Sequence, residues 1–386
     1  MPNTTLSNPS LWNRRFVFLL IAQSGFGFAH SAFMMLPKFL ATELDAGAEE
    51  IGSVVTVSAI AIVFFLIPAG TMVDRYGRKY FLTAGTLLMA IASAGYVFVH
   101  EIGVYLYLLR TLQALAFAYA YSAGSALCVD SAPPNRLGQA IGLYGLSFIV
   151  MGAFAPAAVE TLADLYSWDA CFLLAAGTAT LCGVLSLFIH EERFESAQTE
   201  ETRLFAILMR PEMRRATLVI GLLGIAFGGT FNFYQPYALS LGIDELRDFF
   251  IANSIAAACC RLALGPFIDR MGLRRVSLIS LALYAAMLFS MTWLDQIGLI
   301  IFGLGVGSAH GVFYPAYTAL ILAGCPPEER GRRMALIQGG LNVGIGIAGV
   351  ALGWIAAGYG YPVIFQLACA SLVLAGVLIA TSPSED

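Results

Sequence analysis

The sequence predicts an all-α integral membrane protein with twelve transmembrane helices, arranged as two six-helix bundles related by pseudo-twofold symmetry. Of the 386 residues, 59% are hydrophobic and 12% are charged. The mean hydropathy of +0.78 is too high for a water-soluble protein with a polar surface. The apolar residues form twelve segments, each with the roughly 20 residues that a helix needs to cross a bilayer. Features of the first six segments recur in the last six.

The twelve predicted helices are separated by short polar links, and none of them has the alternating pattern of membrane β-strands. They cover residues 15–37, 50–69, 80–99, 103–128, 137–161, 170–189, 215–238, 246–267, 275–294, 297–323, 332–357 and 361–380.

The basic residues orient these helices, because Lys and Arg are retained on the cytoplasmic side of a membrane. With the N-terminus inside, 17 basic residues lie in the inner links and tails, and two, Lys38 and Arg247, lie at the outer ends. Arg110 and Arg261 remain within the membrane. We therefore expect a multi-pass protein of the bacterial inner membrane with both termini in the cytoplasm.

The longest link, residues 190–214, divides the chain into an N-terminal bundle (1–189) and a C-terminal bundle (215–386). A shift of 193 residues aligns Tyr121 with Tyr314 and Phe172 with Phe365. Internal similarity at half the chain length is typical of duplicated membrane bundles, which place a binding site between them.

Several apolar segments carry polar side chains on one helical face. Such groups cost free energy in lipid unless they face protein or water, so each indicates either a hydrogen bond between helices or the wall of a polar cavity. Their presence in both halves favours a shared cavity with aromatic walls. The candidates are Gln23, His30, Arg110, Gln113, Asn232, Gln235, His310, Tyr314 and Asn342.

Two links share a glycine-punctuated, charged motif. Gly70 to Lys79 follows the second segment, and Gly265 to Arg275 follows the eighth, with an Asp-Arg pair and a glycine at matching positions. Glycine suits a tight turn and basic residues suit the cytoplasmic surface, whereas an acid there needs a partner or a helix dipole. The motif residues are Asp74, Arg75, Gly77, Arg78, Asp269, Arg270, Gly272 and Arg275.

Across its whole length the chain resembles transporters of the major facilitator superfamily. The two links fit the signature of that superfamily and its second copy, and Arg110 with Gln113 is similar to a signature of proton-linked drug exporters. The resemblance implies that Asp74 and Asp269 close an inner gate by resting against the N-termini of the eleventh and fifth helices. It also implies a rocker-switch transporter that exports a small organic solute in exchange for protons.

The chain departs from the exporter pattern in two places. Its fifth segment lacks the Gly-Pro step, and its first segment has no acid in the middle. Proton coupling would then fall to His30 or His310, or to the acids at helix ends, Asp130 and Glu160. Cationic candidates outnumber acids within the membrane, which favours an anionic or amphipathic solute.

Other functions remain open. These are proton-linked or facilitated uptake of a metabolite, and a non-transporting sensor or assembly protein with the same fold. The sequence lacks a catalytic triad, an HExxH motif, a nucleotide-binding loop and metal-ligand spacing of its seven cysteines, so we expect no enzyme, cofactor or metal site. The expected partners are the solute, protons and membrane lipid, with no nucleic acid, and the protein is expected to be a monomer.

Overall fold

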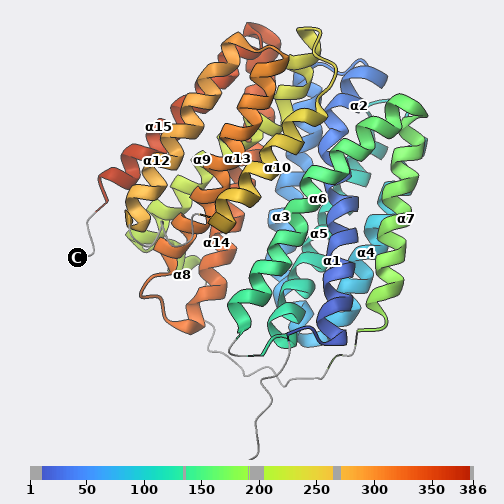
Figure 1. Ribbon diagram of the computed structural model, residues 1–386, viewed down its shortest axis with the longest axis vertical. Helices are drawn as coiled ribbons and strands as arrows, with labels where there is room; N and C mark the ends of the chain where they lie inside the picture. Colours follow the sequence, from blue (N-terminus) through green and yellow to red (C-terminus); the bar gives the residue numbers. More distant parts are fainter. Residues whose placement is uncertain (1–10, 134–135, 190, 192–203, 264–270, 383–386) are drawn as a thin grey trace, which may run out of the picture.

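The computed structural model describes residues 11–133, 136–189, 191, 204–263 and 271–382. Within these ranges the regular secondary structure is entirely helical. The helices lie side by side, with α9 and α12 to α15 on one side of the molecule and α1 and α4 to α7 on the other (Figure 1).

In the first half, one span consists of α1, a short 3-10 turn (Phe33–Met35) and α2, and five long helices follow. Asn13 caps α1, because its side chain accepts a hydrogen bond from the Phe16 N–H at 2.8 Å. The bounds are α1 (Arg14–Ala32), α2 (Leu36–Glu43), α3 (Ala48–Tyr76), α4 (Arg78–Gly95), α5 (Val104–Ser131), α6 (Leu137–Leu165) and α7 (Trp168–Ser186).

The second half begins with the short α8, whose Ile207 packs against Met213 and Leu336. Both α8 and the start of α9 lie within the predicted linker. The bounds are α8 (Leu204–Leu208), α9 (Pro211–Ser240), α10 (Arg247–Ala263), α12 (Leu273–Ser290), α13 (Gln296–Leu322), α14 (Pro327–Tyr359) and α15 (Tyr361–Ala380).

Each predicted transmembrane segment overlaps a helix, and in the described residues 11 spans are long and apolar enough to cross a membrane. The eighth predicted segment corresponds to α10, which has 17 described residues. Several helices extend beyond the predicted bounds. For example, α3 continues to Tyr76 and α14 begins at Pro327, because a helix continues through the charged residues that flank its apolar part.

The two halves meet along α3 and α14 and along α6 and α10. Glycines permit the first contact: a Cβ atom added to Gly349 would lie 2.5 Å from the Gly52 carbonyl oxygen, and one added to Gly353 would lie 2.8 Å from that of Ala48. The hydroxyl of Thr56 then donates to the Gly346 carbonyl at 2.8 Å. Small residues let helix backbones approach closely in a membrane.

This close packing lies at one end of the bundle. A Cβ atom added to Gly152 of α6 would lie 3.9 Å from the Ser254 hydroxyl of α10, but one added to Gly145 or Gly142, farther along α6, would meet no atom of the described residues within 4 Å. The same is true of Gly70 in α3. We call the end of the bundle that carries the turn between α3 and α4 the basic end, and the tight contacts lie toward the opposite end.

Candidate functional site

A buried ion pair lies at the end of the bundle opposite the basic end. The Nζ atom of Lys38 in α2 is 2.6 Å from Oε1 of Glu160 in α6, and the exposed fractions of the two side chains are 10% and 0%. The Glu160 carboxylate also accepts the backbone N–H groups of Leu246 at 3.0 Å and Arg247 at 2.5 Å. A carboxylate from the first half thus caps the N-terminus of α10, where unpaired N–H groups carry partial positive charge.

A second contact between the halves forms where the first span is interrupted. The 3-10 turn Phe33–Met35 replaces regular α-helix there, so the Lys38 N–H does not bond to the Met34 carbonyl. The Gln235 side chain takes the place of this bond: its Oε1 accepts the Lys38 N–H at 3.1 Å, and its Nε2 donates to Met34 O at 2.6 Å. The Lys38 ammonium also donates to Asp244 O at 3.2 Å.

We call these groups the latch: the side chains of Lys38, Glu160 and Gln235 with the backbone of residues 244–247. The sequence indicates Glu160 as an acid at a helix end and Gln235 as a cavity residue, but it identifies Lys38 only as a basic residue at an outer end. Lys38 and Arg247 are the only basic residues at the predicted outer ends. The scarcity of basic residues at the outer ends is the sequence feature that could have identified Lys38 as a functional residue.

The polar side chains of the first half form a cluster around α5. Nη1 of Arg110 donates to Oε1 of Gln113 at 2.8 Å, and the Tyr96 hydroxyl donates to the same oxygen at 3.0 Å. The centroid of the His30 ring lies 4.7 Å from that of Phe117 and 5.8 Å from that of Phe148. The structure therefore brings His30 together with aromatic rings of two neighbouring helices.

Gln23 lies apart from these hydrogen bonds. It is buried, and its Oε1 accepts a hydrogen bond from the Tyr144 hydroxyl at 2.7 Å. This bond joins α1 to α6.

The second half contains a comparable cluster. His310 of α13 lies beside Phe227 and Tyr314, with ring centroids 5.1 and 5.9 Å away. The Tyr314 hydroxyl donates to Gln338 Oε1 at 3.0 Å, and Nδ2 of Asn342 donates to the Gln338 carbonyl at 2.9 Å. The Nδ2 group of Asn232 is buried without a partner in the described structure.

The two glycine-punctuated links contain matching backbone turns. Gly77 has φ 111° and Gly272 has φ 83°, a region that favours glycine. The side chain of Asp74 lies outside the described structure, as do residues 264–270 with Asp269 and Arg270. The gate contacts expected of these residues therefore remain predictions.

Among the other charged residues of this end, Arg78 pairs with Asp130. Arg75 lies over the Tyr76 ring, with its guanidinium carbon 5.4 Å from the ring centroid. Glu191, which the sequence did not single out, accepts the N–H groups of Arg78 at 2.7 Å and Lys79 at 3.0 Å. It caps the start of α4.

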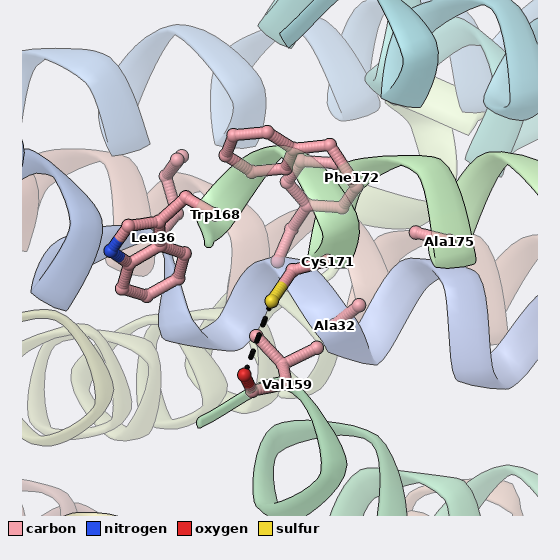
Figure 2. Close-up of a pocket in the computed structure, with 8 residues that line it drawn as sticks. Ala32, Leu36, Val159, Trp168, Cys171, Phe172 and Ala175 are labelled. Atoms are coloured by element: carbon pink, nitrogen blue, oxygen red, sulfur yellow. Dashed lines mark hydrogen bonds between the residues drawn. The ribbon is translucent and has the colours of Figure 1, made fainter. Parts of the chain in front are cut away.

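A small apolar pocket lies near the latch, between α1, α2, α6 and α7 (Figure 2). Its lining includes Phe172 and Trp168, and the Cys171 thiol donates to the Val159 carbonyl at 3.2 Å. None of the described residues that line it is charged. In the part of the chain that the structure describes, no group of three or more His, Cys, Asp or Glu residues has the arrangement of a metal site.

Comparison with known proteins places these features in a family. The model of the Major Facilitator Superfamily matches residues 17–258 and 245–385. Multidrug resistance protein MdtG of Rahnella sp. (strain Y9602) is 27% identical over 93% of this chain and 90% of its own length. The MdtG protein of Citrobacter koseri is 28% identical over 83% and 79%, respectively.

Two solved structures have a similar fold. The nucleoside transporter NupG has a TM-score of 0.77 at 16% identity, with 95% of this chain and 98% of NupG covered. A bacterial homologue of the human lysosomal transporter Spinster, in an inward-facing and occupied conformation, has a TM-score of 0.75 at 14% identity, with 95% of each chain covered. The family model spans most of the sequence, and the chain therefore belongs to the Major Facilitator Superfamily.

Proposed function

We propose that the protein is a secondary transporter that exports a small organic solute across a bacterial inner membrane in exchange for protons. Membership of the superfamily supports secondary transport. The relatives named multidrug resistance proteins support the outward direction. In this proposal the basic end faces the cytoplasm, both termini lie there, and the protein acts as a monomer.

The latch is the observation that carries the proposal. It joins the two halves through side-chain contacts to backbone groups, made by Glu160, Gln235 and Lys38. Such contacts can be broken without unfolding a helix, so they can bias an equilibrium between two arrangements of the halves. We infer that the structure is a state closed at the outer end. In the proposed mechanism, twelve helices form two bundles, and these rock relative to one another around the bound solute.

The inner gate would close in the other state. Asp74 and Asp269 would then rest against the N-termini of α14 and α6, where the helix dipole favours a negative charge. Gly77 and Gly272 supply the turns that position these acids, while Arg75, Arg270 and Arg275 anchor the links to lipid phosphate. Arg78, which already pairs with Asp130, fixes the first link to α5.

The solute would bind between the halves, among polar side chains that belong to both. His30 and His310, each surrounded by aromatic rings, are the proposed proton carriers. Imidazole is suited to this role because its ordinary pKa lies near physiological pH. Asp130 is held by Arg78 and Glu160 by the latch, so we give these two acids a role in conformational change rather than in carrying the proton.

The test uses the full chain in proteoliposomes of known orientation, with a pH-sensitive dye inside. Amphipathic acids, sugars and cationic drugs are added with and without an imposed pH gradient. Proton flow that depends on the solute and runs opposite to it would support export in exchange for protons. Solute movement without proton flow would contradict the coupling, and proton flow in the same direction as the solute would indicate uptake instead. If no solute moves under either condition, a sensor or assembly role becomes the better explanation.

A further inference from the structure

Arg110 is a cation within the membrane that has no acidic partner among the described residues. It lies in α5 and is half-buried, and its Nη1 donates to Gln113. Within the described structure, no carboxylate lies within 4.0 Å of its guanidinium nitrogens. Its Nε–H group is buried, and no described residue supplies an acceptor for it. A charge inside a membrane protein is costly unless it is paired or faces water, so this guanidinium lacks the counter-charge that its position requires.

Gln113 adds a second unpaired donor beside it. The side chain is 4% exposed, and its Oε1 accepts hydrogen bonds from both Arg110 and Tyr96. Rotating the amide by 180° would place its NH2 group against the Arg110 donor, so the hydrogen bonds fix its orientation. The Nε2 group is left buried and without an acceptor. In the described structure, the Arg110 Nε–H group and the Gln113 Nε2 group are therefore both buried donors without an acceptor.

Aromatic rings lie next to this donor pair. Phe117 follows Gln113 by four residues in α5, so the two side chains share a helix face, and the His30 ring lies beside Phe117 and Phe148. Phe117 stacks on Tyr121 with ring centroids 5.2 Å apart. Binding sites for small organic molecules combine such apolar walls with a few polar groups that fix orientation.

We propose that Arg110 and Gln113 bind the carboxylate of an organic anion whose apolar ring or chain packs against His30, Phe117 and Phe148. The inference rests on the proposed transport function and specifies the chemical class of the solute. A carboxylate offers the acceptors that both donors lack, and a guanidinium binds it in a bidentate manner. A cation would be repelled by Arg110, and a neutral amide would gain only uncharged hydrogen bonds.

The test measures binding of three probes that share one ring system and differ in charge: 2-naphthoate, 2-naphthamide and 2-naphthylmethylamine. The full-length protein is purified in a neutral detergent without anionic lipid, so that no lipid phosphate competes for Arg110. Calorimetric titration at neutral pH should show naphthoate binding at least about tenfold more tightly than the amide, the scale of one hydrogen bond to a charged group. Equal or tighter binding of the amine, or no binding of naphthoate, would overturn the proposal.

Variants locate the site. Arg110→Gln should weaken naphthoate binding about tenfold or more and leave naphthamide binding nearly unchanged. Arg110→Lys, which keeps the charge but loses the planar fork, should show an intermediate loss. Arg214→Gln is the matched control, because it removes one exposed positive charge at the start of α9 that has no side-chain partner in the described structure. Equal losses in Arg110→Gln and Arg214→Gln would overturn the assignment to Arg110.

Binding and transport can fail separately. If naphthoate binds through Arg110 but no solute crosses the proteoliposome membrane, the anion site stands and the transport function fails. If solutes cross but the binding order of the three probes does not depend on Arg110, transport stands and the anion site is refuted.

Discussion

Replacing Glu160 by Gln should loosen the outer end of the protein without unfolding it. The two carboxylate oxygens of Glu160 each accept one backbone N–H from the start of α10. A Gln side chain replaces one of these oxygens by an NH2 donor, so one of the two N–H groups loses its acceptor. A hydrogen bond to a charged group contributes about 1.5–3 kcal/mol. Losing one such bond and the charge on the other should cost about 2 kcal/mol, which increases the population opened at this end about 30-fold.

Hydrogen exchange reports this change directly, because the Leu246 and Arg247 amide hydrogens are themselves the donors. Mass spectrometry of the protein in lipid nanodiscs should show exchange in a peptide covering residues 241–248 accelerating by that factor, when opening is the limiting equilibrium. Asp164→Asn is the matched control on the same helix. Asp164 is exposed, and its Oδ1 atom lies 3.9 Å from the Lys38 Nζ atom. An ion pair at an exposed carboxylate contributes little to stability.

The double variant Lys38→Met with Glu160→Gln separates two causes. Glu160→Gln alone leaves the buried Lys38 ammonium without its carboxylate, which is itself destabilising. If the lost cap on α10 is the cause, exchange stays fast in the double variant. A return to slow exchange in the double variant, or unchanged exchange in Glu160→Gln, would refute the reasoning about the latch.

Three other changes test the remaining parts of the molecule. Gly349→Val should speed exchange at residues 241–248 as well, because its Cβ would press on the Gly52 carbonyl oxygen and separate α3 from α14; unchanged exchange would show that this contact does not hold the outer end closed. Asp74→Asn should leave membrane insertion intact and slow transport in vesicles, since the proposed inner gate loses its charge; a normal rate removes that gate. Replacing both His30 and His310 by Gln should uncouple solute flux from an imposed pH gradient, and flux that still follows the gradient would exclude the histidines as proton carriers.

The helices were largely predictable because their signal is local. Each apolar run is long enough to cross the membrane, so segments such as 103–128 and 297–323 agree to within three residues with α5 (Val104–Ser131) and α13 (Gln296–Leu322). Glycine at matching positions in the two links likewise indicated a tight turn, and Gly77 and Gly272 both have positive φ. The interruption of the first span at Phe33–Met35 was not anticipated.

The neighbours of each polar side chain could not be predicted in the same way. Gln23, Gln113 and Gln235 all looked like cavity residues. The structure pairs Gln23 with Tyr144, places Gln113 beside Arg110, and inserts Gln235 into the break of the first span. Helical spacing shows which side chains share a face, but it does not show what that face meets.

The sequence by itself determined that this is a multi-pass helical protein, because hydrophobic length is a property of the chain, and its internal repetition predicts two related halves. Only the tertiary structure decided which charges are paired. Lys38 and Glu160 are 122 residues apart and meet because α2 and α6 converge at one end of the bundle. Among the described residues, the helices packed around α5 place no carboxylate within 4.0 Å of the Arg110 guanidinium nitrogens. The free energy of a charge in a membrane depends on its neighbours in space, and those are fixed only when the helices pack.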